Sequence, residues 1–81
     1  MHRDPSRAAE IGRRVREARD ALGLRQDELA LAAGVSTRVV HQIERGKPTS
    51  RLDTLLRVLE ALGLTIEIRQ RRPYGERAPD T

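Results

Sequence analysis

Side chains suited to reading nucleic-acid bases cluster between residues 37 and 45. In a helix, which turns by about 100° per residue, one arc carries Thr37, Arg38, His41, Gln42 and Arg45. The opposite arc carries Val39, Val40, Ile43 and Glu44. In the major groove of DNA, Arg binds guanine and Gln binds adenine through paired hydrogen bonds. This face therefore suits duplex DNA, although taken alone it also matches an ordinary solvated surface.

Residue sets for catalysis or metal binding are not evident in the sequence. The chain has no Cys, and its two His residues, His2 and His41, are far apart in sequence. We find neither a glycine-rich phosphate loop nor a plausible grouping of Ser, His and an acid. We expect no enzymatic activity, no metal site and no cofactor.

Helices must position the polar face, and apolar periodicity predicts where they lie. The first runs from about residue 7 to Leu22 and ends before Gly23, and the second runs from Gln26 to Ala33. The third begins after Ser36, a good N-cap, and ends at Gly46, a natural left-handed C-cap. The polar face thus belongs to a short third helix that follows a tight turn.

A fourth helix is predicted from about Arg51 to Leu62, with Ser50 and Asp53 resembling a short capping box. Its apolar stripe consists of leucines: Leu52, Leu55, Leu56, Leu59 and Leu62. Because the connections are short, we predict a compact all-α domain of four to five helices.

The apolar period changes from helical to alternating after Gly63. In the run LTIEIRQ, polar residues alternate with three apolar ones: Leu64, Ile66 and Ile68. This predicts a β-strand at residues 64–70 with no partner strand in its own chain. The same strand of a second copy could pair with it across a two-fold axis, or the segment could pack on the helices as an extended tail. Residues 1–6 and the tail 71–81 are expected to be flexible, which leaves 7–63 as the helical domain.

Composition narrows the class of protein. At 81 residues the chain is long enough for one small domain, and 16 Lys and Arg against 12 acids give a net charge of +4. Tyr74 is the only aromatic residue, which argues against modules that stack single-stranded bases on aromatic side chains. With no long apolar run and no secretion leader, we expect no membrane association and a cytoplasmic, nucleoid-associated protein.

Two stretches of the sequence resemble one family. The first is LRQDELALAAGVSTRVVHQIERGK, and the second, LDTLLRVLEALG, follows it. Over residues 11–63 the sequence is similar to the Xre/Cro family of helix-turn-helix regulators. The resemblance implies a homodimer on a palindromic operator in double-stranded DNA. It implies base reading by Thr37, Arg38, His41 and Gln42. It also implies that Arg19 and Glu44 form a structural ion pair.

Phosphate contacts follow from the resemblance and from the positions of polar side chains. The candidates are Gln26, Ser36, Arg13, Arg14, Arg45, Lys47, Ser50 and Arg51. The sequence departs from the family pattern at Arg25, which cannot accept a hydrogen bond as a cap, and at Val39. We expect the start of the second helix to depend on Gln26 and on DNA instead.

The continuation GLTIEIRQRR resembles the HipB-type antitoxins within this family. That resemblance implies a repressor of its own operon that also restrains a HipA-like kinase toxin. Two alternatives stay open: a free-standing Xre-type transcriptional regulator without a toxin, and a protein-interaction module that has lost DNA binding.

Overall fold

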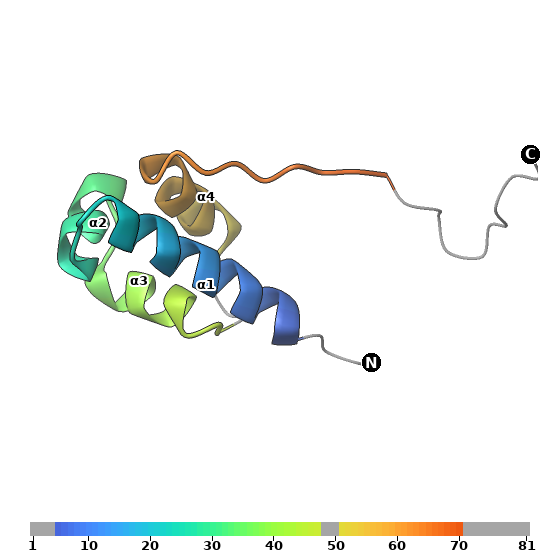
Figure 1. The fold of residues 1–81 in the computed structure, drawn as a ribbon, viewed down its shortest axis with the longest axis horizontal. Coiled ribbons are helices and arrows are strands. Elements are labelled where there is room, and N and C mark those ends of the chain that lie inside the picture. Colours follow the sequence, from blue (N-terminus) through green and yellow to red (C-terminus); the bar gives the residue numbers. More distant parts are fainter. Residues whose placement is uncertain (1–4, 48–50, 71–81) are drawn as a thin grey trace, which may run out of the picture.

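The computed structural model describes residues 5–47 and 51–70, and its regular elements are all helices. These are α1 (Pro5–Ala21), α2 (Gln26–Ala33), α3 (Thr37–Glu44) and α4 (Leu52–Ala61) (Figure 1). The prediction of a compact all-α domain is confirmed, with four helices in the described part. α1 starts at Pro5, two residues earlier than expected, because Pro is readily accommodated in the first turn of a helix.

The turn between α2 and α3 forms as the sequence predicts. Gly34 adopts a left-handed conformation with φ of 72°, and the Val35 amide donates to the Ala30 carbonyl at 3.0 Å. Ser36 then caps α3, since its hydroxyl accepts a hydrogen bond from the Val39 amide at 3.2 Å. This short connection fixes α3 against α2.

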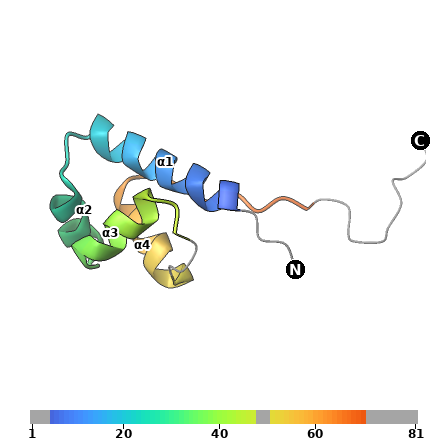
Figure 2. The same cartoon turned by 90° about the horizontal axis from the view of Figure 1, so that it is seen from below.

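The hydrophobic core lies between all four helices. Val15, Leu29, Val40 and Val58 are fully buried, one from each helix. α1 packs on α3, and α2 packs on both α3 and α4 (Figure 2). The core is completed by Ala30, Ala33, Ile43, Leu59 and Leu62.

The leucine stripe predicted for α4 is partly wrong. Leu59 and Leu62 are buried, but Leu52 and Leu56 are exposed, and Val58 faces the core in their place. The N-cap of α4 is Arg51, whereas Ser50 lies outside the described residues. The four described helices therefore leave Leu52 and Leu56 on α4 uncovered.

Residues 64–70 run as an extended segment that pairs with no strand among residues 5–47 and 51–70. The Leu64 amide donates to the Leu59 carbonyl at 2.8 Å, and Leu64 packs against the core. Beyond it the segment leaves the helical domain (Figures 1 and 2). The alternative of an extended tail on the helices thus describes its first residues, and pairing with a second copy stays a prediction for the rest.

Candidate nucleic-acid interface

One face of α3 presents unpaired polar side chains to solvent. Thr37, Arg38, His41 and Arg45 are exposed, and Gln42 is half-buried. Among residues 5–47 and 51–70, no hydrogen bond or ion pair engages the side chains of Arg38, His41 or Gln42. The opposite face holds Val40 and Ile43 in the core. The structure therefore brings the predicted base-reading residues together on one accessible surface with their donors free.

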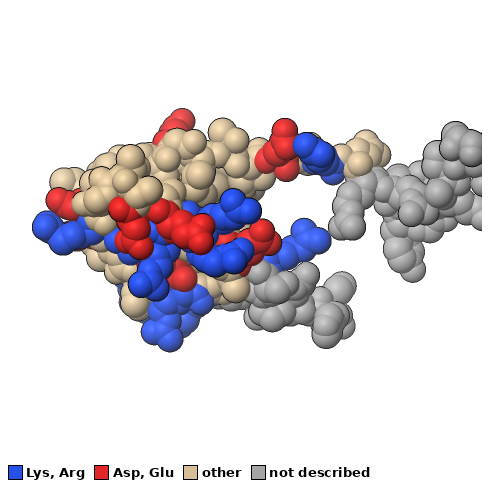
Figure 3. Space-filling view, viewed as in Figure 1, with Lys and Arg blue, Asp and Glu red and all other residues tan. Residues whose placement is uncertain are grey.

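Charge is distributed unevenly over the domain surface. In Figure 3, Lys and Arg side chains lie at the lower left, where Figure 1 places α3, and also across the middle of this face, where Asp and Glu lie among them. The upper surface, over α4 and the start of the extended segment, is mostly uncharged. The side of this view that carries α3 therefore has more charged side chains than the upper surface.

A buried carboxylate anchors the end of α3 to α1. Arg19 Nε donates to Glu44 Oε2 at 2.6 Å, and Arg19 Nη2 donates to Glu44 Oε1 at 3.0 Å. Arg19 Nη1 donates to the Leu24 carbonyl at 2.8 Å, so the same guanidinium also holds the α1–α2 connection. The Arg19 and Glu44 side chains are only 12% and 5% exposed. The ion pair inferred from the resemblance is therefore present, and two hydrogen bonds join its largely buried side chains.

The ionisation of this pair follows from its surroundings. Burial opposes the charged form of Glu44, but hydrogen bonds from Arg19 and Gln26 outweigh it, so the pKa of Glu44 lies below its usual value. The hydrogen bond to Glu44 raises the pKa of Arg19. Both groups are therefore charged at neutral pH, and each neutralises the other.

Gln26, expected to contact phosphate, also supports this network from α2. Its Nε2 donates to Glu44 Oε1 at 3.1 Å. A Gln amide has a second N–H and a carbonyl oxygen, so a phosphate contact is still compatible with this bond. The structure thus gives Gln26 a role that the sequence did not suggest, which is to tie α2 to the end of α3.

The start of α2 is stabilised within the chain, contrary to the expectation that it depends on Gln26 and DNA. The Arg25 amide donates to Glu28 Oε1 at 2.8 Å. The Arg25 side chain bonds to Asp27 Oδ1 at 3.1 Å, and this hydrogen bond lowers the pKa of Asp27. Glu28 therefore supplies the cap that the Arg25 side chain cannot provide.

The other phosphate candidates occupy different parts of the surface. Arg45 and Lys47 are exposed just after α3. Arg51 is exposed at the start of α4 and lies 3.5 Å from Asp53 Oδ1. Ser36 is exposed at the start of α3 and serves as its cap. Ser50 lies outside the described residues.

Arg13 and Arg14 lie on different sides of α1. Gly12 marks the side of α1 that touches α3, and at about 100° per residue Arg14 points to the far side. Arg14 instead lies beside the first residues of the extended segment, which include Leu64 and Thr65. Arg13 is closer to the α3 side, so of the two it alone is compatible with a phosphate contact next to α3.

Two glycines that position α3 were not singled out for this role by sequence reasoning. A Cβ on Gly12 would lie 2.3 Å from the Ile43 carbonyl oxygen, and one on Gly46 would lie 2.9 Å from Ala9 Cα. Gly46 also has φ of 76°. The close spacing of Ala8, Ala9 and Gly12 on α1 is the signal that could have revealed this contact, since small residues let helices approach closely.

Within the described residues, no three His, Cys, Asp or Glu side chains are grouped so as to hold a metal ion. None of the four helices is both long and apolar enough to cross a bilayer, as far as the described chain extends.

Comparison with known proteins agrees with this geometry. The model of the helix-turn-helix family HTH_3 matches residues 15–68. The HTH-type transcriptional regulator y4mF of Sinorhizobium fredii is 48% identical over 60 residues, which are 74% of this chain and 79% of that protein. An HTH-type regulator of Haemophilus influenzae is 37% identical over 51 residues, and the chain spans about half of it, 52%. The crystal structure of the restriction-modification controller protein C.AhdI from Aeromonas hydrophila superposes with a TM-score of 0.69 at 33% identity, covering 79% of this chain and 93% of that one.

Proposed function

The chain belongs to the helix-turn-helix family of Xre/Cro-type, DNA-binding transcriptional regulators, and from that premise we propose that α3 reads base sequence in the major groove of duplex DNA. This is a family of regulators and not of enzymes. The observation that carries the proposal is the free polar face of α3, held in place by the Arg19–Glu44 contact.

Each side chain of this face has a base that suits it. Arg38 offers a paired contact to guanine, and Gln42 offers one to adenine. Thr37 at the first turn can touch a thymine methyl group, and His41 lies between Arg38 and Arg45 along the same face. Together these residues would distinguish one operator sequence from others.

Backbone contacts would set the position of α3 on the duplex. Arg45, Lys47 and Ser36 flank α3 at its two ends, and Arg13 and Gln26 come from α1 and α2. Arg51 is a further candidate at the start of α4. We withdraw Arg14 from this set, because it lies beside the extended segment on the far side of α1. Such contacts give affinity without sequence preference.

A dimer is the assembly that we propose for operator binding. A two-fold dimer presents two copies of α3 to half-sites that are separated by about one helical turn of DNA or a multiple of it. The extended segment supports this assembly, since the backbone of residues 65–70 has no hydrogen-bond partner among the described residues.

Of the three functions that the sequence left open, a free-standing regulator is the one we favour. The relatives bear the names of transcriptional regulators and of a restriction-modification controller, and none of these names describes an antitoxin. A HipB-like role with a kinase toxin therefore rests on the sequence resemblance alone. A module that has lost DNA binding is disfavoured by the free donors on α3.

Affinity purification of the tagged protein from its own cells tests these alternatives. We expect the protein's own promoter DNA to co-purify without a stoichiometric protein partner. Recovery of a kinase-like protein together with that DNA would restore the antitoxin function. Recovery of a partner protein with no specific DNA would contradict the proposed function.

A further inference from the structure

The side-chain amide of Gln26, the first residue of α2, is engaged at only one of its two N–H groups. Its Nε2 donates to Glu44 Oε1 at 3.1 Å, and no other described residue bonds to this amide. Gln26 is half-buried at the surface where α2 meets the end of α3. Because an amide nitrogen carries two hydrogens, the second N–H of Gln26 is free to donate to another molecule.

The charge of Glu44 determines which way this amide faces. Glu44 is ionised at neutral pH, because its pKa lies below the usual value, and an ionised carboxylate only accepts hydrogen bonds. If the amide turned by half a rotation, its carbonyl oxygen would face Glu44 Oε1 with no hydrogen between the two oxygens. The amide nitrogen therefore faces Glu44 as long as Glu44 keeps its charge.

Glu44 is itself held from the opposite side by α1. Arg19 donates to Glu44 Oε2 at 2.6 Å and to Glu44 Oε1 at 3.0 Å, and this second oxygen is the one that accepts from Gln26. Arg19 neutralises Glu44, and the neighbouring pair of Arg16 and Asp20, 3.9 Å apart, adds one charge of each sign. A phosphate that approaches Gln26 therefore meets no net negative charge from this network.

We propose that Glu44 is a positioning residue for DNA binding, which holds the Gln26 amide nitrogen so that its second N–H donates to one phosphate of the DNA backbone. Arg19 acts one step further back, because it holds and neutralises Glu44. The donor is thus oriented before DNA arrives, so less rotational freedom is lost on binding. This inference rests on the proposed DNA-binding function and identifies what sets one of its backbone contacts.

The position of Glu44 at the end of α3 links this phosphate contact to the reading helix. A phosphate contact fixes how the protein sits on the duplex but does not distinguish base pairs. Loss of the Glu44–Gln26 bond should therefore weaken binding to every duplex by a similar factor and leave the base preference unchanged. A change in α3 itself would instead alter the base preference, so the two effects can be separated by measurement.

Uncharged phosphate analogues identify the contact. The probe is a duplex that the wild-type protein enriches from a random pool, made as a series in which a methylphosphonate replaces one phosphate at a time. We expect one position per half-site at which this replacement weakens wild-type binding by about tenfold. At the same position the replacement should change the binding of Gln26→Met, which lacks the amide, by no more than about twofold.

The role of Glu44 is tested with Arg19→Met/Glu44→Leu, which removes both charges and keeps side chains of similar size. Circular dichroism establishes first that this variant is folded. It should lose most of the sensitivity to the methylphosphonate at the Gln26 position, although Gln26 is still present. Arg45→Ala is the matched control, because Arg45 is exposed just after α3: it should bind more weakly but keep the full sensitivity at that position. Wild-type sensitivity in Arg19→Met/Glu44→Leu would overturn the proposal.

A measurement on the unsubstituted protein keeps the test independent of that variant's folding. In protein labelled with nitrogen-15, the two protons on Gln26 Nε2 give separate nuclear magnetic resonance signals. When the enriched duplex is added, we expect the signal of the proton that faces Glu44 to stay in place and the signal of the other proton to shift. Shifts of similar size in both signals would show that the amide leaves Glu44 on binding, which contradicts a positioning role.

The inference and the proposed function fail in different ways. A wild-type protein that enriches no duplex would remove the proposed function and this inference with it. A protein that enriches a duplex, but for which no phosphate position depends on Gln26, would remove this inference alone.

Discussion

At the scale of single residues, α3 needs two kinds of side chain to act as a reading helix. Side chains that read bases must be free, and Arg38, His41 and Gln42 make no bonds with other described residues. Side chains that hold the helix in place must be engaged, and Glu44, on the same short helix, accepts hydrogen bonds from Arg19 and Gln26. The free side chains and the engaged Glu44 therefore belong to the same eight-residue helix.

Removal of one partner of the buried pair should be costly. Arg19→Ala leaves the Glu44 carboxylate in a site where it is 5% exposed, and we expect the free energy of unfolding to fall by about 3–5 kcal/mol. Urea denaturation followed by circular dichroism measures this loss. In the double variant Arg19→Met/Glu44→Leu the loss should be clearly smaller than the sum of the losses in Arg19→Met and in Glu44→Leu. Additive losses would show that the two charges do not interact.

The same carboxylate predicts how stability depends on pH. The folded-state pKa of Glu44 is below its ordinary value of 4.5, so the ionised group stabilises the fold above about pH 4.5. This contribution is lost as the pH falls through the lower, folded-state pKa. Glu44→Gln should therefore be less stable at neutral pH and show a flatter decline in stability between roughly pH 5 and pH 3. Glu17→Gln, an exposed change on α1, should keep the wild-type slope, and an equal slope in Glu44→Gln would contradict the assignment.

At the scale of elements, α1 determines where the end of α3 lies. Gly12→Ala would place a methyl group 2.3 Å from the Ile43 carbonyl oxygen, and backbone cannot move aside as a flexible side chain does. In an exposed helix this change stabilises by up to about 1 kcal/mol. Here we expect destabilisation by about 1–3 kcal/mol, measured by thermal or urea unfolding. A stabilised Gly12→Ala variant would show that α1 and α3 are not in contact at this point.

Local signals explain why α2 and α3 were predictable. Gly34 and Ser36 determine the turn through conformations and caps that involve only near neighbours, so the bounds of α2 matched the prediction. Which side of α4 is buried in the core was not predictable in the same way. Its leucines fall on one arc of the helix, but the buried side is centred closer to Val58, so Leu52 and Leu56 at the other edge of the arc stay exposed. α2 is a neighbour that packs on α4. Burial of that kind depends on tertiary contacts, which periodicity does not specify.

The candidate site was predictable in part for the same reason. The arc of α3 follows from helical geometry alone, whereas the placement of Arg13 and Arg14 depends on how α1 lies on the domain. Gln26 shows the same limit, because its bond to Glu44 joins residues 18 positions apart. Positions within an element follow from its period, whereas contacts between elements need the structure or, as for Arg19 and Glu44, the resemblance to a family.

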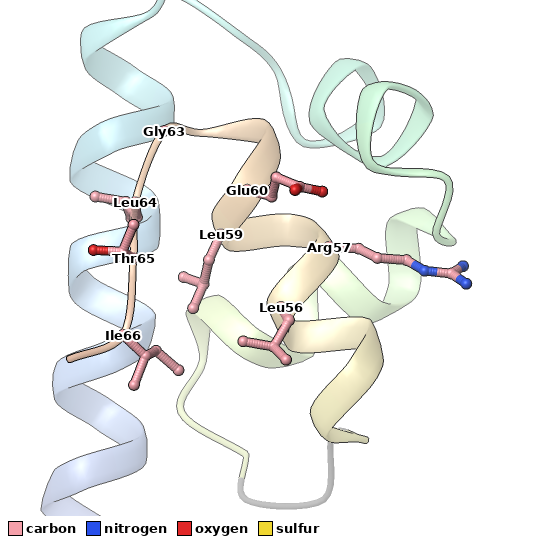
Figure 4. A pocket seen from close by; sticks show the side chains of 8 residues that line it. All are labelled: Leu56, Arg57, Leu59, Glu60, Gly63, Leu64, Thr65 and Ile66. Atoms are coloured by element: carbon pink, nitrogen blue, oxygen red, sulfur yellow. The ribbon is translucent and has the colours of Figure 1, made fainter. Parts of the chain in front are cut away.

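At the scale of the whole molecule, the two functional surfaces lie on different elements. α3 carries the polar face that we propose for DNA, and an apolar groove lies between α4 and residues 64–66 (Figures 1 and 4). A dimer formed through residues 64–70, as proposed for operator binding, would not use the polar face of α3.

The link between the two surfaces can be tested with one substitution. Ile68→Pro removes a backbone donor from the proposed strand pairing, but Ile68 is 92% exposed, so the helical domain should keep its stability. We expect a weaker dimer in sedimentation and, because binding at two half-sites is lost, at least tenfold weaker binding to a two-site operator. Binding to a single half-site should be unchanged. Equal loss on both DNAs would point to an effect other than dimerisation.

The central claim is that α3 reads base sequence, and selection from a random pool of DNA duplexes tests it most directly. The wild-type protein should enrich one two-fold symmetric sequence. On that sequence Arg38→Ala and Gln42→Ala should each lose about 1–3 kcal/mol of binding free energy and relax the preference at one base position per half-site. Arg14→Ala, which removes the same charge on the far side of α1, should retain sequence preference. Enrichment of no sequence, or unchanged preferences in Arg38→Ala and Gln42→Ala, would contradict the assignment of α3 as the reading helix.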